Sequence, residues 1–157
     1  MSVLQAIVSR LRADQRGASL VELALMAPIL LVMLAGTVDC ARLISTKVRL
    51  QQAAERTVEM ASAGGISTTS SSTVQTNMQN DATATAPSSQ VSVALWLECN
   101  GTKQSDFNAS CNTGDQVARY ASVSLTDSYS PSFPWLFGRS ATNRAIAVSG
   151  SASVRLQ

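Results

Sequence analysis

Few residues in this sequence are of a type that carries chemistry. The chain has no histidine and three cysteines, Cys40, Cys99 and Cys111. It therefore lacks the side chain that most often serves as a general base and as a transition-metal ligand. Lys47 and Lys103, the candidate lysine bases, stand in no Ser-x-x-Lys pattern, and there is no glycine-rich phosphate loop or calcium loop. We expect no enzyme activity, no cofactor and no metal site.

The cysteines raise a separate question. Cys99 and Cys111 flank residues 100–110, between two predicted strands. Such a pair can form a disulfide in an oxidising compartment, and the bond would add about 3 kcal/mol of stability. Two free thiols and half of a zinc site are the alternatives, and zinc is disfavoured without histidine or a second cysteine pair. We predict the disulfide, and we expect Cys40 to be a small buried residue.

A carboxylate stands inside the longest apolar segment. Residues 18–38 would form about 31 Å of helix, enough to cross a hydrocarbon core of about 30 Å. Glu22 lies about 6 Å inside this segment. A carboxylate costs about 2.5–3.5 kcal/mol at the centre of a membrane helix and less near the edge, and anchoring alone does not require one. If the chain is cut between Gly17 and Ala18, Glu22 lies one turn from the new α-amino group and can offset an ammonium, its own or a neighbour's.

The first seventeen residues do not form an ordinary secretory signal. Three arginines precede Gly17, but the apolar block is longer than a signal's and no Ala-x-Ala motif follows it. Three basic residues within 42–49 balance the three arginines, so the positive-inside rule does not decide the orientation.

The stretch RGASLVELALMAPILL combines a basic leader ending in glycine with a glutamate at the fifth position after it. It resembles the prepilins that an aspartic prepilin peptidase cuts. The longer run, residues 16–63, resembles TadE-like proteins, the minor pilins or pseudopilins of tight-adherence (Tad, Flp-type) pili. The matching positions are Gly17, Glu22, Pro28 and the QQAAER stretch of residues 51–56, and the sequence departs from the pattern at Leu23, where an aromatic residue is more usual.

The resemblance implies a non-enzymatic pilin-like subunit, cut between Gly17 and Ala18, with Glu22 as a recognition or assembly determinant. Its partners would be the prepilin peptidase, other pilins, the Tad pilus machinery and membrane lipid. It would cross the bacterial inner membrane once, with the N-terminus cytoplasmic and the C-terminal domain periplasmic. Nucleic acid is not expected, because from residue 18 onward nine basic and nine acidic residues balance. An unprocessed membrane anchor or scaffold displaying a small binding or adhesive domain is the alternative.

We expect an α+β fold that opens with one long helix. The leader is residues 1–17, the transmembrane helix 18–41, and its periplasmic continuation 42–63, before Gly64 and Gly65. Pro28 is expected to kink the helix. The continuation is amphipathic, and arginines 42, 49 and 56 lie on a solvated face. Its apolar stripe consists of Leu43, Leu50, Ala54, Val58 and Ala61.

A small antiparallel sheet is expected to follow. Residues 64–90 are rich in serine and threonine and are predicted to form a flexible or loosely helical linker. In the periplasmic β domain, 91–157, apolar alternation predicts about three strands, in QVSVALWL, QVARYASVSLTDSY and RAIAVSGSASVRL. The stretch SPSFPWLFG, with two prolines and three aromatic residues, is expected to be a covering loop.

Overall fold

A computed structural model describes residues 17–63, 70–140 and 142–156 of the chain. The chain divides into two compact units, one ending at Cys40 and one spanning Ala41–Gln157. The predicted leader lies outside the described residues except for Gly17. One helix, α2 (Ala18–Ala63), contributes to both units and has the bounds predicted from the sequence.

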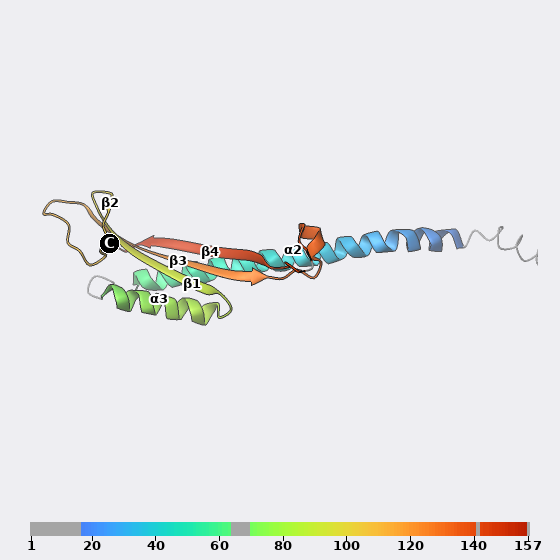
Figure 1. The fold of residues 1–157 in the computed structure, drawn as a ribbon, viewed down its shortest axis with the longest axis horizontal. Helices are drawn as coiled ribbons and strands as arrows, with labels where there is room; N and C mark the ends of the chain where they lie inside the picture. The colour runs from blue at the N-terminus through green and yellow to red at the C-terminus, as the bar shows by residue number, and fades with distance from the viewer. Residues whose placement is uncertain (1–16, 64–69, 141, 157) are drawn as a thin grey trace, which may run out of the picture. The chain divides into compact units, whose positions relative to one another are not determined.

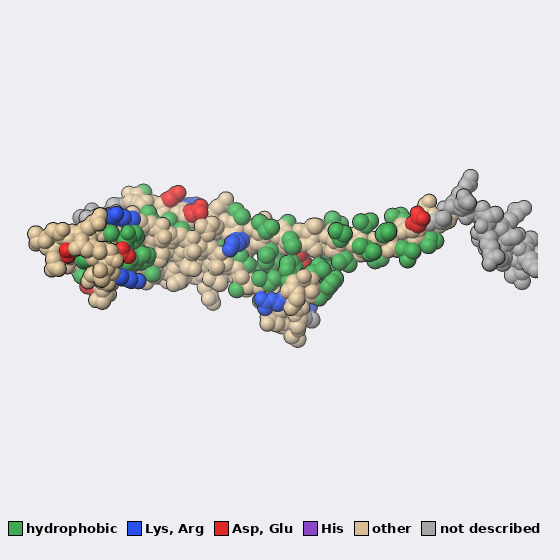
Figure 2. Space-filling view, turned by 90° about the horizontal axis from the view of Figure 1, so that it is seen from above, with side chains coloured by type: hydrophobic (Ala, Val, Ile, Leu, Met, Phe, Trp, Pro, Cys, Tyr) green, Lys and Arg blue, Asp and Glu red, His purple; other side chains and the backbone are tan. Residues whose placement is uncertain are grey.

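In the first unit, large apolar side chains are exposed all along α2. Leu20, Leu25 and Leu31, for example, are 72%, 68% and 65% exposed. Hydrophobic side chains cover the helix segment next to the grey N-terminal residues in Figure 2. This helix is long and apolar enough to cross a membrane. Pro28 lies inside it and has no N–H to donate to the carbonyl of Ala24, and the kink expected there stays a prediction.

The second unit combines two helices with a sheet (Figure 1). Besides α2 it contains α3 (Ser71–Thr85), the short 3-10 helix η3 (Pro134–Phe137) and four strands. The strands are β1 (Gln90–Cys99), β2 (Thr102–Lys103), β3 (Val117–Tyr129) and β4 (Ile146–Arg155). The sheet order is β2-β1-β3-β4, with every neighbouring pair antiparallel. The predicted α+β class is confirmed, and the additional strand is the two-residue β2.

Alternating side chains give the sheet one face toward the core. Val93 of β1 pairs with Val123 of β3, and Leu125 pairs with Val91 on one side and Gly150 on the other. The helices contribute the rest of the core. The apolar stripe predicted on α2 is confirmed, because Leu50, Ala54 and Val58 are buried and Leu43 and Ala61 pack against the cluster.

The opposite face of the sheet carries mostly small polar side chains. Ser92, Ser124 and Ser151 follow one another across the three long strands. The helices contribute to the core on the other face, and one polar, solvated side is the usual pattern of an antiparallel sheet.

The serine- and threonine-rich segment contains a second helix, α3. Of the two alternatives, a flexible or a loosely helical linker, residues 71–85 adopt the helical one. Val74, Met78 and Ala82 lie four residues apart and are buried in the core. This spacing places them on one side of a helix, so apolar burial stabilises α3 despite its serine- and threonine-rich sequence.

α2 approaches β4 closely at one point. A Cβ atom built on Gly150 would lie 2.5 Å from the Gln51 nitrogen, so a side chain at this position would collide with the helix backbone. The side-chain amide of Gln51 pairs with the backbone of Ser151. Its Oε1 accepts from the Ser151 nitrogen at 3.2 Å, and its Nε2 donates to the Ser151 carbonyl at 3.1 Å. Gln51 thereby satisfies backbone groups on the open edge of β4, which a partner strand would otherwise satisfy.

The loop between β3 and β4 differs from the expected cover. Its prolines Pro131 and Pro134 are buried. Phe133, Trp135 and Leu136, however, are 40%, 59% and 38% exposed. The prediction of a covering loop is therefore wrong for these three side chains, because the buried prolines hold the loop backbone against the domain and the residues between and after them point outward.

Candidate processing and assembly site

The predicted scissile bond lies at the beginning of α2. Gly17 is exposed, and apart from its neighbours in the chain no atom lies within 4 Å of the position that a Cβ would occupy. The helix begins at the next residue, Ala18. Gly17 itself has 3-10 helical conformation, so the bond between them lies in the first described turn, directly before α2.

Glu22 lies in the second turn of α2, four residues after Ala18, and its side chain is exposed. It forms no ion pair with any residue that the structure describes. The rise from Ala18 to Glu22 is about 6 Å along the helix axis. The carboxylate is thus placed near the proposed new N-terminus, where the helix dipole favours a negative group.

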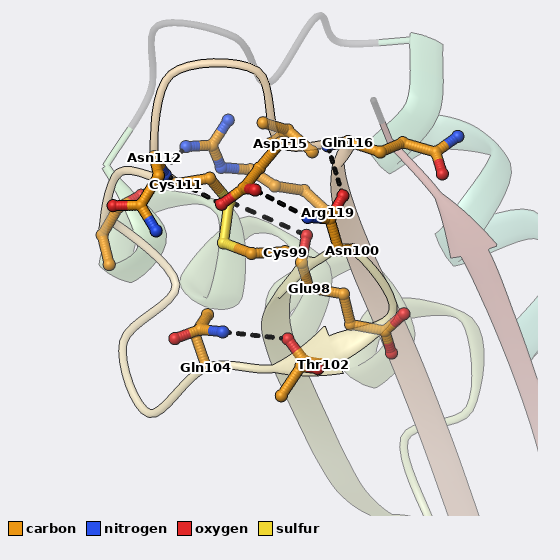
Figure 3. The surroundings of a disulfide bond; sticks show 12 residues. Glu98, Cys99, Asn100, Thr102, Gln104, Cys111, Asn112, Asp115, Gln116 and Arg119 are labelled. Carbon is orange, nitrogen blue, oxygen red and sulfur yellow. Dashed lines mark hydrogen bonds between the residues drawn. A yellow bond between two sulfur atoms is a disulfide. The ribbon is translucent and has the colours of Figure 1, made fainter.

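The predicted disulfide is present in the second unit. Cys99 at the end of β1 is bonded to Cys111, with a Cα–Cα distance of 5.6 Å (Figure 3). Between them, Asn100 and Gly101 form the two-residue turn to β2, with φ values of 51° and 77°. Two positive φ angles are typical of the type I′ turns that Asn-Gly favours in hairpins.

Side-chain hydrogen bonds order the loop around the disulfide. Asn100 donates from Nδ2 to Asp115 Oδ1 and accepts at Oδ1 from the Gln116 nitrogen at 2.8 Å. Asp115 Oδ2 accepts from the Asn112 nitrogen at 3.0 Å. The cysteines stand out in the sequence but this network does not, because the partners of Asn100 lie 15 and 16 residues later in the chain.

The prediction that Cys40 is buried is not confirmed. Cys40 is a free cysteine and is exposed, so the expectation of a buried residue is wrong. The described residues of its unit belong almost entirely to one helix and include no second element to pack over it. No group of three or more candidate metal ligands occurs in the described parts of the chain.

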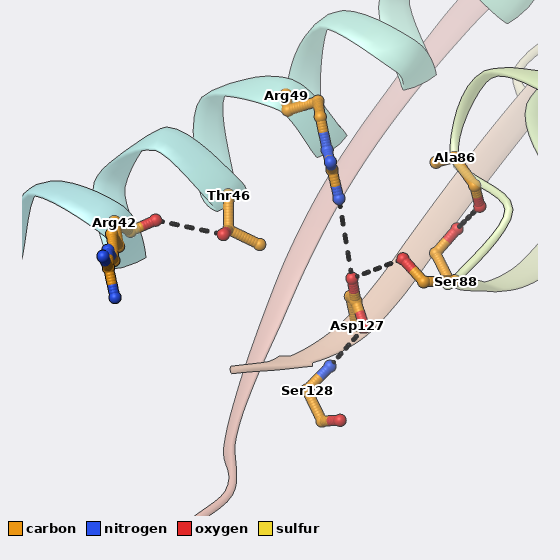
Figure 4. A network of polar contacts seen from close by, with 8 residues as sticks. Arg42, Thr46, Arg49, Ala86, Ser88, Asp127 and Ser128 are labelled. Carbon is orange, nitrogen blue, oxygen red and sulfur yellow. Dashed lines mark hydrogen bonds and ion pairs between the residues drawn. The ribbon is translucent and has the colours of Figure 1, made fainter. Parts of the chain in front are cut away.

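An ion pair that the sequence did not predict joins three elements. Arg49 of α2, expected on a solvated face, is 60% exposed but lies 3.9 Å from Asp127 of β3. Ser88, in the turn between α3 and β1, donates to the same carboxylate oxygen at 2.9 Å (Figure 4). An exposed pair contributes little stability, about 0–1 kcal/mol, but it establishes which end of the sheet lies beside this turn of α2.

The comparisons with known proteins agree with the N-terminal resemblance. The model of the TadE-like protein family matches residues 17–59. This confirms the predicted resemblance for α2, from Gly17 to beyond the QQAAER stretch. No curated protein and no solved structure matches the chain significantly.

Proposed function

We propose that this chain is a membrane-inserted minor pilin or pseudopilin of a Tad-type pilus system. A prepilin peptidase would remove residues 1–17, residues 18–41 of α2 would lie in the inner membrane, and the rest of α2 would lie in the periplasm with the other elements of the second unit. The observation that carries this proposal is the TadE-like match, which begins at Gly17, the residue before the proposed cut. The apolar, exposed helix that follows supports the membrane location.

We propose that Glu22 sets the axial register between subunits during assembly. While the chain is in the membrane, the carboxylate lies near the edge of the span, where its cost is smallest. When α2 packs among other pilins, a buried carboxylate without a partner would be strongly unfavourable. An α-ammonium group of a neighbouring subunit, created by the same peptidase, would neutralise it and thereby select one axial register between the helices.

The mature N-terminus tests this proposal directly. The intact mass and N-terminal sequence of the chain from native membranes should show a protein beginning at Ala18. Gly17→Val should block the cut, because a branched side chain replaces the exposed glycine at the bond, and should leave a chain 17 residues longer. Gly36→Val, the same change later in α2, is the control and should be cut normally. A wild-type chain that begins at Met1 or Ser2 would contradict processing.

The alternative is an unprocessed anchor or a scaffold of the pilus machinery. The second unit, with its disulfide-linked loop, would then serve as a binding or adhesive domain. An anchor would tolerate Gly17→Val without loss of function. A scaffold would stay in the membrane fraction with its partners and would be missing from sheared surface fibres, where an incorporated pilin would be found.

A further inference from the structure

Large apolar side chains are exposed in the loop of residues 130–145, between β3 and β4. Trp135 is 59% exposed, and Phe133 contacts it edge to face with ring centroids 6.5 Å apart. Leu136 is 38% exposed beside them. Side chains of this size lose favourable free energy when they stay in water, so such a group often marks a contact surface.

The loop is a formed structure that presents these side chains outward. Pro134 is buried and begins η3, and Gly138 ends this turn with a φ of 65°, where glycine is favoured. The Gly138 nitrogen donates to the Trp135 carbonyl at 3.2 Å, and the Arg139 nitrogen donates to the Pro134 carbonyl at 3.0 Å. The exposure of Trp135 is therefore a property of an ordered turn.

The charge of the loop has one sign. Residues 130–145 contain Arg139 and Arg144, both exposed, and no aspartate or glutamate. Aromatic rings with arginine are typical of membrane interfaces, where the rings lie among the headgroups and basic side chains attract anionic lipid.

The loop connects β3 to β4 at one end of the sheet in the second unit. Asp127, near the end of β3, contacts Arg49, and Gly150 of β4 lies against Leu50. This end of the unit is where α2 enters it, at Ala41, three residues after the apolar segment 18–38.

We propose that the loop of residues 130–145 docks on the lipid headgroups of the membrane that holds residues 18–38. Phe133, Trp135 and Leu136 would lie at headgroup level, and Arg139 near the lipid phosphates. The proposal rests on the membrane insertion in the proposed function but not on cleavage or pilus assembly. Docking would hold the second unit against the membrane surface, and extraction of α2 into a fibre would require the loop to detach.

The two tryptophans provide a built-in comparison. Trp96 lies on β1 near the disulfide, stacked on Tyr120 at 5.3 Å, and Trp135 lies in the loop at the opposite end of the sheet. The full chain carrying Trp96→Phe is reconstituted in phosphatidylethanolamine–phosphatidylglycerol vesicles. Its tryptophan fluorescence then comes from Trp135 alone. Lipids brominated near the headgroup should quench its fluorescence strongly. The matched Trp135→Phe chain, which reports Trp96 alone, should show no such quenching.

Charge removal tests the contribution of arginine. In the Trp96→Phe chain, Arg139→Gln should weaken docking about fivefold, which corresponds to the roughly 1 kcal/mol expected for one basic residue near an anionic surface. Arg56→Gln removes the same charge from an exposed position on α2, farther along the chain from the apolar segment, and should leave the quenching unchanged.

The other outcomes separate this proposal from the proposed function. If the chain floats with the vesicles but Trp135 is quenched no more than Trp96, the docking proposal is overturned and the pilin proposal stands. A blue-shifted Trp135 emission without quenching by lipid would also overturn it, since protein would then cover the loop. A chain that does not float with the vesicles contradicts both proposals.

Discussion

At the scale of single residues, Glu22 is the position that general stability does not explain. A leucine there would improve membrane insertion, because an apolar side chain avoids the cost of desolvating a carboxylate. The structure places Glu22 on an exposed position of α2, one turn after Ala18, with no ion pair among the described residues. We therefore expect the Glu22 carboxylate to pair with a group of another chain, an interaction that does not occur in a single subunit.

The corresponding prediction separates insertion from assembly. Glu22→Ala should insert at least as well as the wild type, because it removes a charge from the apolar segment, and it should lose most of its incorporation into surface fibres. Carbonate extraction of membranes measures the first property, and the amount of subunit in sheared fibres measures the second. Leu23→Ala shortens the next side chain without removing a charge and is the control. Normal incorporation of Glu22→Ala, with a mature N-terminus, would refute the register mechanism.

Some of these residues could be predicted from the sequence and others could not. Glu22 stands out because it is a charge in an apolar run, and the disulfide could be predicted because Cys99 and Cys111 are the only cysteines of the polar half. The close approach at Gly150 depends on a contact with Gln51, a hundred residues earlier, and no local pattern indicates it. Cys40 shows the opposite error, since burial was assumed from residue type alone.

At the scale of elements, the periodic segments were predicted, and the weakly patterned one was left open between a flexible and a loosely helical linker. α2 and the three long strands carry regular apolar spacings that match helix and sheet periods. α3 is rich in serine, threonine and asparagine, which have low helix propensity, so its composition indicated a linker. The four-residue spacing of Val74, Met78 and Ala82 was the available signal.

α3 is also held to α2 by a polar contact. The buried Thr57 hydroxyl lies 2.9 Å from Asp81 Oδ2 and 3.0 Å from the carbonyl of Ala53, so its single proton is shared between two acceptors. Thr57→Val keeps the shape and removes the donor. We expect a loss of about 1–2 kcal/mol in the free energy of unfolding, near the lower range for bonds to charged groups because Asp81 is only partly buried and water can replace the hydroxyl.

Urea unfolding of the detergent-solubilised chain, followed by circular dichroism, measures this loss. Thr83→Val is the matched control on α3, since the exposed Thr83 hydroxyl donates only within its own helix, to the Gln79 carbonyl at 2.7 Å. Equal effects of the two substitutions would show that the contact between the helices contributes nothing beyond helix propensity.

At the scale of the whole molecule, charge does not decide which side of the membrane the second unit occupies. Basic residues flank the apolar segment equally on both sides. The disulfide supplies the missing argument, because a Cys99–Cys111 bond persists in an oxidising compartment and not in a reducing cytosol. The unit that carries it is thus expected in the periplasm, and the N-terminus in the cytoplasm.

Thiol labelling tests this orientation. Cys40 is free and exposed at the end of the apolar segment, whereas Cys99 and Cys111 are bonded to each other. A membrane-impermeant maleimide added to spheroplasts should therefore label the wild type at one site, and Cys40→Ala should not be labelled. A Ser2→Cys chain that also carries Cys40→Ala, and Gly17→Val to retain the leader, should react only after the inner membrane is disrupted. The reverse pattern would place the disulfide-bearing unit in the cytoplasm and contradict a periplasmic pilin domain, because the same bond would then face a reducing environment.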